Sequence, residues 1–307
     1  MNNALFKQRL NQFADKGELT AFNLATVMEG LQIVQDLHSQ NTGTEVIEQR
    51  EGEYKSWDPE ILKVDIECEN QYRRRLEERG SPVVMLSEEA GRVDINENSA
   101  GEKLFCVCDP FDGSYLFKRG IPDFWYSSLS FYGVDFSPKS CVVGDCTHHT
   151  LAFANQEGAF IGSLQENTLA NEFKLDPTYR DQMGRSEVTD MEEASIESYG
   201  MKPQKYLIPL VSQYEDLLRP FKFYLPNGGP YGFVDVAEGK IDVYFAVQQP
   251  FVDVFSGIYI AEQAGLMVTD FEGESVRFTD DPETMHNVVV STNSTLHNKV
   301  LEQLSSQ

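Results

Sequence analysis

The stretch Asp109-Pro110-Phe111-Asp112-Gly113-Ser114 decides how this chain is interpreted. Pro110 fixes its own φ angle, so a tight turn is expected directly after Asp109. The two aspartates that bracket the turn can then point at the same spot, and the Phe111 carbonyl falls between them. Gly113 lets the backbone approach a ligand closely. The stretch therefore places several oxygen atoms around one point.

Ser114 begins a short segment, residues 115–119, which Gly120 ends and which is predicted to be a helix. The first N–H groups of this helix would face the oxygen atoms of the turn, and a helix N-terminus binds phosphate readily. An ordinary surface turn is the alternative, because Asp-Pro and Asp-Gly pairs are common in turns and serine is a common helix cap.

Two further carboxylates stand at the ends of apolar segments. Glu88 closes the run at residues 83–87, and Asp253 opens a small-residue helix over residues 251–257. Hard cations such as Mg²⁺ take oxygen ligands, and four carboxylates beside a Gly-Ser turn are the parts of a two-metal phosphatase. Taken alone, Glu88-Glu89 could be a solvated charge pair and Asp253 a helix cap.

Together these segments resemble the inositol monophosphatase and fructose-1,6-bisphosphatase superfamily. The family patterns are Gly-Glu-Glu, then Asp-Pro-(Ile/Leu)-Asp-Gly-(Thr/Ser), then Trp-Asp followed by Glu-Ala-Gly-Gly. They correspond here to residues 87–89, 109–114 and 252–265, in the same order and at fitting spacings. The resemblance covers roughly residues 20–307. It implies an α+β fold, the layered α/β/α/β/α sandwich of the inositol monophosphatase and sugar phosphatases.

The resemblance also implies a set of metal ligands. Glu88, Asp109 and the Phe111 carbonyl would hold the first ion, and Asp109, Asp112 and Asp253 would hold the second. The ions would be Mg²⁺, two or three in number, with Mn²⁺ as an alternative. Lithium, which is thought to occupy the second position in such enzymes, is expected to inhibit.

The attacking water is likewise assigned by the resemblance. Asp65 would accept a hydrogen bond from the Ser114 hydroxyl, which together with Glu88 would orient and deprotonate the water. The N–H groups of Gly113 and Ser114 would hold phosphate oxygens. A third, weaker ion would bind Glu88 and Asp65.

The second half of the chain is expected to shape the pocket for the rest of the substrate. Asn227, Gly228 and Gly229 stand just before a predicted helix, where backbone N–H groups can bind a ligand. Inositol-specific relatives carry a glutamate seven residues before the last metal-binding aspartate, and Ala246 stands there in this chain. We therefore expect a small, uncharged wall and a weak preference for inositol monophosphate. Candidates for binding a second phosphate, each of which could equally be a solvated surface residue, are Lys118, Arg119, Lys202 and Lys205.

Composition and charge limit the possible partners. The 307 residues carry 25 basic and 49 acidic side chains, a net charge of −24, which disfavours nucleic-acid backbones and anionic membranes. A small phosphorylated metabolite would be repelled as well unless metal ions reverse the field locally. No apolar run reaches membrane-spanning length and no secretory leader is visible, so a cytoplasmic location is expected. The resemblance also implies that the protein forms a homodimer.

The five cysteines do not suggest a metal site. Cys106 and Cys108 lie two apart on a predicted strand and face the same way, and their spacing is not that of zinc ligands. Buried thiols are the expectation.

Hydrophobic periodicity predicts two regions of different organisation. Residues 1–165 are expected to form an α+β domain with an antiparallel sheet and most of the metal ligands. Residues 166–307 are expected to form an α/β domain that supplies Asp253 and the pocket wall. The expected helices are 3–15, 18–39, 65–79, 205–218, 230–239, 253–264 and 294–305. The expected strands are 82–87, 103–108, 125–133, 140–146, 150–155, 221–225, 241–246, 266–270 and 286–291. The polar residues 39–59 indicate a mobile loop.

Two function classes follow. One is a Mg²⁺-dependent phosphoric monoester hydrolase acting on an inositol phosphate, a sugar phosphate or a nucleotide bisphosphate. The other is a non-catalytic relative that binds metal or a metabolite and regulates a partner. The intact set of candidate residues favours the enzyme.

Overall fold

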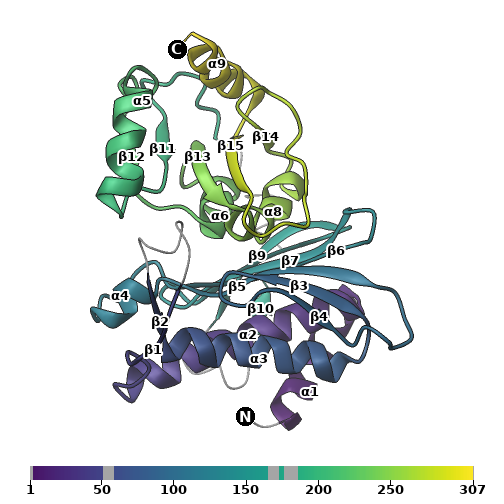
Figure 1. Ribbon diagram of the computed structural model, residues 1–307. Coiled ribbons are helices and arrows are strands. Elements are labelled where there is room, and N and C mark those ends of the chain that lie inside the picture. Colours follow the sequence, from purple (N-terminus) through teal and green to yellow (C-terminus); the bar gives the residue numbers. More distant parts are fainter. Residues whose placement is uncertain (1–2, 51–58, 165–172, 176–185, 307) are drawn as a thin grey trace.

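The computed structural model of the protein describes residues 3–50, 59–164, 173–175 and 186–306 (Figure 1). The helices are α1 (Asn3–Gln12), η1 (Ala14–Lys16), α2 (Glu18–Ser39), α3 (Lys63–Arg79), α4 (Ser114–Lys118), η4 (Pro203–Leu207), α5 (Ile208–Leu218), α6 (Pro230–Ala237), α7 (Phe251–Phe255), α8 (Ile258–Gln263) and α9 (Ser294–Ser305). The strands are β1 (Val46–Gln49), β2 (Glu60–Leu62), β3 (Val83–Ser87), β4 (Gly91–Ile95), β5 (Leu104–Asp112), β6 (Tyr126–Tyr132), β7 (Pro138–Asp145), β8 (Thr150–Asn155), β9 (Gly158–Leu164), β10 (Phe173–Leu175), β11 (Ser195–Glu197), β12 (Phe223–Leu225), β13 (Val243–Pro250), β14 (Met267–Thr269) and β15 (Met285–Ser291).

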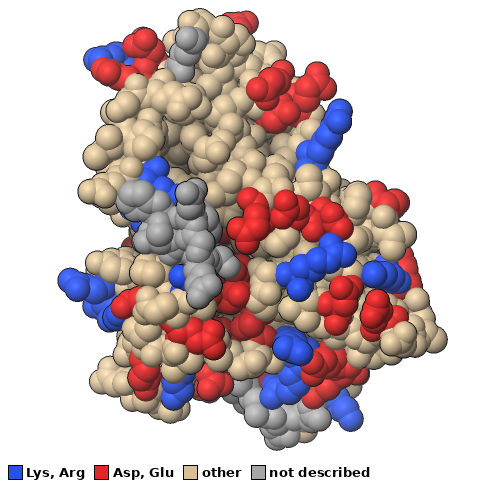
Figure 2. All heavy atoms as spheres, in the orientation of Figure 1, with Lys and Arg blue, Asp and Glu red and all other residues tan. Residues whose placement is uncertain are grey.

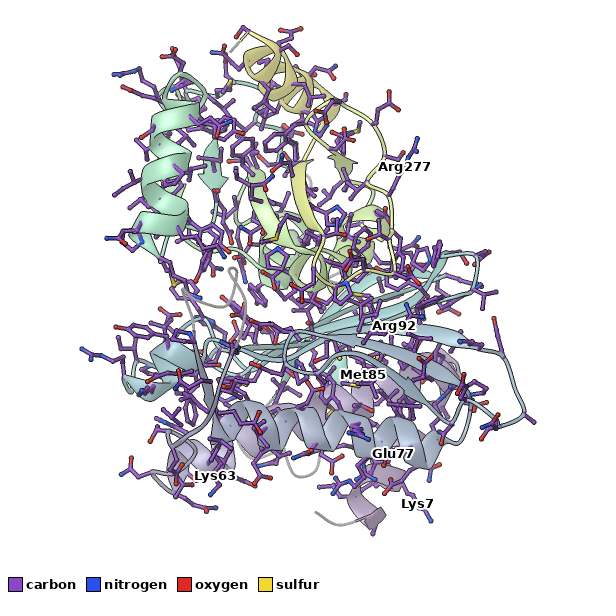
Figure 3. All side chains as sticks on the ribbon, viewed as in Figure 1. Lys7, Lys63, Glu77, Met85, Arg92 and Arg277 are labelled. Carbon is purple, nitrogen blue, oxygen red and sulfur yellow. The ribbon has the colours of Figure 1, made fainter. Side chains whose placement is uncertain are left out.

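The elements stack in five layers. Helices α1, α2 and α3 cover one face of an eight-stranded sheet, and α6, α7 and α8 lie between that sheet and a five-stranded sheet (Figure 1). Helices α5 and α9 cover the far face of the second sheet. Three apolar clusters fill the spaces between these layers. Met85, on β3, belongs to the cluster on the side of α2 and α3 (Figure 3). The predicted layered α/β/α/β/α sandwich is confirmed.

The first sheet differs from the expected antiparallel run at one place. Its strand order is β10-β9-β8-β7-β6-β5-β3-β4. Strands β3 and β5 pair in parallel, and the other neighbouring pairs of strands in this sheet are antiparallel. The cause is β4, which forms a hairpin with β3 before the chain crosses to β5. The sequence did not predict β4 because, as an edge strand, it alternates partly exposed and exposed residues until Ile95. Strand β10 still pairs with β9, so this sheet extends past residue 165.

The second sheet is mixed. Its order is β12-β11-β13-β15-β14, with β11 parallel to both neighbours and β15 antiparallel to β13 and β14. The polar residues 39–59, predicted as a loop, contain β1, which forms a hairpin with β2. Gly52 and Lys55 of that stretch, and most of residues 165–185, lie outside the described residues.

The helix expected over residues 253–264 is two helices, α7 and α8, which break at Ser256 and Gly257. A Cβ on Gly257 would lie 2.6 Å from the Pro230 carbonyl oxygen, so α6 approaches too closely for a continuous side-chain-bearing helix. Side chains from β6 donate to the carbonyl groups at this break: the Tyr132 hydroxyl donates to the Phe255 carbonyl (2.5 Å) and Ser130 Oγ to the Ser256 carbonyl (3.0 Å). Sequence periodicity could not reveal these partners.

The surface carries charges of both signs. Figure 2 shows acidic side chains on both halves of one face, with basic ones between them. Arg92 on β4 lies where the two halves meet (Figure 3), and its Nη1 is 2.7 Å from an Asp280 carboxylate oxygen. All five cysteines are buried free thiols, and Cys106 and Cys108 share the cluster beneath α2 and α3, as predicted. Within the described ranges, no helix is both long and apolar enough to cross a membrane.

Candidate active site

The stretch from Asp109 to Ser114 contains a strand bulge rather than a free turn. Strand β5 continues through Asp112, four residues beyond the predicted end, and its pairing with β6 shifts register between Asp109 and Asp112. Pro110 sits inside the irregularity, which is where a strand tolerates a residue without an N–H group. Bulges redirect side chains next to functional sites. The bulge brings Asp112 close enough that, in addition to burial and Glu88, its charge raises the pKa of Asp109.

Three hydroxyl groups fix this bulge. Ser127 Oγ donates to the Pro110 carbonyl (2.8 Å) and is itself 2.7 Å from the Tyr72 hydroxyl on α3. Ser128 Oγ lies 3.2 Å from the Asp109 backbone nitrogen. None of the three residues was predicted from the sequence, although serines within the mainly apolar and aromatic segment 126–132 are a signal that buried hydroxyls have a partner there.

Gly113 is held in a conformation that only glycine adopts easily. Its φ angle is +111°, and an added Cβ would lie 2.3 Å from the Phe124 carbonyl oxygen. The chain therefore makes its closest approach to the neighbouring loop at the point where α4 begins. Ser114 is the first residue of α4, which ends before Gly120, as the sequence predicted.

Ser114 and Asp65 form the contact that the resemblance implied. Ser114 Oγ donates to Asp65 Oδ1 at 2.5 Å, and the other carboxylate oxygen accepts from the Leu62 backbone N–H at 2.7 Å. Asp65 lies in the first turn of α3 and is buried. Burial, followed by the charge of Glu89, raises the pKa of Asp65 to about 7. Two elements far apart in sequence thus hold one acid–hydroxyl pair.

Glu88 and Glu89 are not a solvated charge pair. Their side chains are 20% and 8% exposed, and Arg50, 4% exposed, lies against both. Arg50 Nε donates to Glu89 at 3.0 Å, while Nη2 is 3.9 Å from Glu88 Oε1. A further acid, Glu69, accepts from Ser87 Oγ at 2.5 Å, and burial raises its pKa to about 7. Sequence reasoning named neither Arg50 nor Glu69, because each lies within a run of charged residues.

Asp109 and Asp253 are acids with raised pKa values. Burial, and then the neighbouring Glu88, Asp112 and Asp253, raises the pKa of Asp109 well above its ordinary value. Burial and Asp112 do the same to the pKa of Asp253, which Lys202 and Lys205 oppose. Asp253 lies inside α7, whose N-cap is Pro250, so the alternative reading of this residue as a helix cap is excluded.

A pocket of about 480 Å³ opens over these groups and takes its lining from both halves of the chain. It holds nine of the predicted site residues: Glu88, Phe111, Asp112, Gly113, Ser114, Asn227, Gly228, Gly229 and Asp253. Asp65 and Asp109 are buried and lie beside it. Of the basic candidates, Lys202 lines the pocket, whereas Lys118 forms an ion pair with Glu60 and Arg119 is exposed.

The predicted role of Ala246 is wrong. Ala246 is fully buried in the core between the layers and does not line the pocket. A register shift in β13 between Ala246 and Gln249, with Gln248 at a φ of +50°, turns Gln249 into the pocket instead. Counting residues back from Asp253 could not detect this bulge. The wall nevertheless carries an uncharged side chain, as expected.

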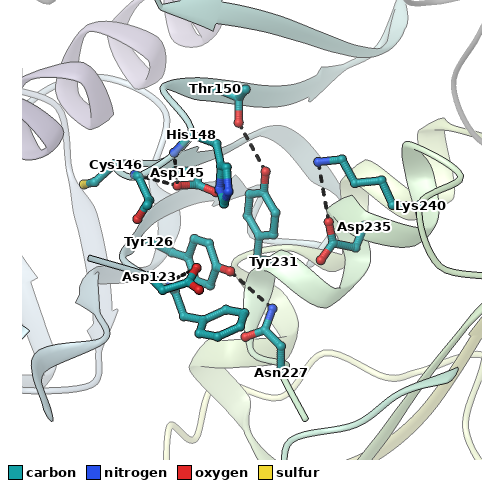
Figure 4. Close-up of polar contacts among 12 residues, drawn as sticks. Asp123, Tyr126, Asp145, Cys146, His148, Thr150, Asn227, Tyr231, Asp235 and Lys240 are labelled. Atoms are coloured by element: carbon teal, nitrogen blue, oxygen red, sulfur yellow. Dashed lines mark hydrogen bonds and ion pairs between the residues drawn. The ribbon is translucent and has the colours of Figure 1, made fainter. Parts of the chain in front are cut away.

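The loop at residues 227–229 is anchored to the first half of the chain. Asn227 Nδ2 lies 3.2 Å from the Tyr126 hydroxyl, and the Tyr126 ring stacks on that of Tyr231 at a centroid distance of 4.3 Å (Figure 4). The Tyr231 hydroxyl lies 3.2 Å from Thr150 Oγ1. A Cβ on Gly229 would lie 2.8 Å from Asp112 Oδ2, so the loop touches the carboxylates directly.

The donor set fits a hard divalent cation. All its side-chain ligands are carboxylates, and Asp109 Oδ2 is buried with no hydrogen-bond partner, as expected of an oxygen reserved for an ion. In the part of the chain that the structure describes, no three His, Cys, Asp or Glu side chains already surround one point as metal ligands. The assigned ligand set stays a prediction.

Comparison with known proteins agrees with this site. The family model of the inositol monophosphatase family matches residues 15–307, and the chain belongs to this family. Its members generally use divalent metal ions and are phosphatases. A relative from Archaeoglobus fulgidus described as a fructose-1,6-bisphosphatase/inositol-1-monophosphatase is 27% identical over 229 residues, which are 73% of this chain and 76% of the relative.

Solved structures confirm the fold. The extragenic suppressor protein suhB from Bartonella henselae superposes with a TM-score of 0.70 at 17% identity, over 92% of this chain and 96% of that one. Inositol monophosphatase II from Staphylococcus aureus gives a TM-score of 0.68 at 17% identity, over 94% of both chains.

Proposed function

We propose that this chain is a Mg²⁺-dependent phosphoric monoester hydrolase acting on a small phosphate ester. The observation that carries the proposal is the Ser114–Asp65 hydrogen bond, set in the same pocket as Glu88, Asp112 and Asp253. A relative that only binds metal or a metabolite has no need of a buried acid bonded to a hydroxyl beside the carboxylates.

The predicted residues would hold the metal ions. Glu88, Asp109 and the Phe111 carbonyl are proposed for one ion, and Asp109, Asp112 and Asp253 for another, with Mn²⁺ as a possible substitute. When bound, such cations offset the charge that develops on attacking and leaving oxygens in phosphoryl transfer.

The chain's own groups position the water and the ester. Because Asp65 accepts the Ser114 hydrogen, the lone pairs of Ser114 Oγ remain available to accept a proton from water beside Glu88. The N–H groups of Gly113 and Ser114 are proposed to bind phosphate oxygens. The water oxygen attaches to phosphorus while its proton passes to Ser114 Oγ and the Ser114 proton passes to Asp65. The ester P–O bond breaks, and the alkoxide leaves on the side of residues 227–229 and takes a proton from solvent.

Phosphate release from a panel of esters is the direct test of this function. Mg²⁺-dependent release that disappears with chelator, and that is lost in Asp253→Asn, is the expected result. Absence of release from inositol, sugar and nucleotide phosphates alike would leave the non-catalytic alternative. Lithium chloride in the same assay at limiting Mg²⁺ tests the proposed lithium sensitivity. The homodimer and the cytoplasmic location are proposed on the resemblance alone, and sedimentation and cell fractionation test them.

Substrate preference follows from the carboxylates that the described pocket lining contains. Apart from Glu88, Asp112 and Asp253, the described pocket lining contains no carboxylate that could read inositol hydroxyls. We expect kcat/KM for inositol monophosphate to exceed that for fructose-1,6-bisphosphate and 3′-phosphoadenosine 5′-phosphate by less than ~100-fold, a difference on the order of 3 kcal/mol. A larger preference would contradict the prediction.

Metal binding should release protons. The pKa values of Asp109 and Asp253 are raised by burial, so these groups hold protons at a higher pH than ordinary aspartates do. An ion displaces those protons, and its affinity should therefore rise with pH. Calorimetric titration in buffers of different ionisation enthalpy measures the number of protons released. A binding enthalpy that is identical in all buffers would refute the predicted release of protons.

A further inference from the structure

The pocket wall away from the carboxylates is built largely from aromatic rings. Tyr115 and Phe124 come from the first half of the chain, and Tyr199 and Tyr206 come from the second. The two pairs of rings thus come from different halves of the chain and line one pocket. Met201 and Pro203 extend the apolar part of the same wall.

The two rings from the second half are held in place before any ligand arrives. Tyr199 and Tyr206 pack edge to face, with centroids 4.9 Å apart and an angle of 82° between their planes. Tyr206 is 8% exposed, so it is fixed by its surroundings. Tyr115 directly follows Ser114 and is 60% exposed although it lines the pocket. Tyrosine offers a large contact area with few rotatable bonds, and this lowers the entropy lost on binding.

The two amide side chains of the described lining are already bonded to the protein. Asn227 donates to the Tyr126 hydroxyl and Gln249 to the Val247 carbonyl at 3.1 Å. A planar aromatic ligand can stack on the rings of this wall, whereas a polyol ring has no π-face to offer them.

We propose that the leaving group of the physiological substrate carries a planar aromatic ring, received by Tyr115 and Phe124 on one side and by Tyr199 and Tyr206 on the other. This inference rests on the proposed phosphatase function and narrows its substrate class. The ring is either the base of a nucleotide or the aryl group of an aromatic alcohol, because stacking on aromatic side chains accepts any π-face.

A matched pair of esters isolates the ring. Benzyl phosphate and cyclohexylmethyl phosphate have the same linkage, the same number of carbon atoms and similarly basic leaving alcohols. We expect kcat/KM to be roughly 2- to 12-fold higher for benzyl phosphate, which is the factor that ring stacking contributes. Equal values would overturn the inference. Adenosine 5′-monophosphate against ribose 5-phosphate forms the second pair, and a preference there that exceeds the benzyl preference assigns the ring to a nucleobase.

Substitutions test whether the preference for benzyl phosphate depends on the tyrosine rings of the pocket. Tyr199→Leu and the more exposed Tyr115→Leu keep an apolar side chain, so each should lower kcat/KM for benzyl phosphate while leaving cyclohexylmethyl phosphate unchanged. Phe223→Leu is the matched control, because Phe223 is 57% exposed and is not among the described residues lining the pocket. Equal losses for both esters would assign these tyrosines to folding and overturn the inference.

Binding separates this inference from the proposed function. Benzylphosphonate and cyclohexylmethylphosphonate cannot be hydrolysed, and their dissociation constants with Mg²⁺ present are measured by calorimetry. Tighter binding of the benzyl compound supports the aromatic site even if no ester is turned over, in which case only the hydrolase proposal fails. Equal binding of the two, together with turnover of either ester, overturns the aromatic site and retains the hydrolase.

Discussion

Replacing Ser114 with alanine is expected to lower kcat by roughly 10²–10⁴-fold, the usual contribution of general acid–base assistance. The hydroxyl links the pocket to Asp65, to which Ser114 Oγ donates at 2.5 Å. Without it, a water molecule beside Glu88 has no acceptor that passes its proton to a buried acid. Steady-state phosphate release at saturating Mg²⁺ measures the change.

Two controls separate this role from a structural one. Ser114→Thr keeps the hydroxyl and should retain most of the turnover. Metal affinity in Ser114→Ala should equal that of the unaltered protein, since no predicted side-chain ligand of the two main ions is removed. Wild-type turnover in Ser114→Ala would show that the Asp65–Ser114 pair does not act on the water.

Most of the residues that the sequence grouped as a candidate site line one pocket, whereas the bounds of the strands around it were predicted less well. Glu88, Asp112, Gly113, Ser114 and Asp253 were recognised because their chemistry is carried by short local motifs. Each motif fixes its own backbone, as the +111° φ angle of Gly113 illustrates. Such short motifs can be recognised in the sequence without knowing which distant segments pack against them.

What the sequence could not predict are features that arise from pairing between distant segments. The bulge that turns Gln249 rather than Ala246 into the pocket exists only in the register of β13 against β15. The break between α7 and α8 depends on Pro230, and the position of Arg50 depends on Glu89. None of these contacts leaves a periodic pattern in the sequence.

Asp109→Asn is expected to change metal affinity and stability in opposite directions. The variant keeps the shape of the side chain and removes the charge that is proposed to bridge two ions. Mg²⁺ affinity should fall by at least ~10²-fold, since even the partners of metal ligands alter affinity by 10–100-fold. Calorimetric titration with Mg²⁺ or Mn²⁺ measures it, and unchanged binding would refute the ligand assignment.

The metal-free variant should at the same time be more stable than the unaltered protein near neutral pH. Burial and the acids around it raise the pKa of Asp109, and its Oδ2 is buried without a hydrogen-bond partner. A folded state that holds a proton more tightly than the unfolded state loses stability as pH rises from the ordinary aspartate pKa through the raised one. Asparagine does not titrate, so the gain should grow over that range and vanish below it.

Urea denaturation in chelator at several pH values tests the stability change, with Asp216→Asn as the control for loss of one negative charge. Asp216 is exposed on α5 and lies outside the described pocket lining, so its replacement should alter neither metal affinity nor the pH dependence. A metal-free Asp109→Asn protein that is less stable at every pH would mean that this carboxylate stabilises the fold by itself. The opposite result would show that Asp109 is kept at a cost to stability because the metal requires its charge.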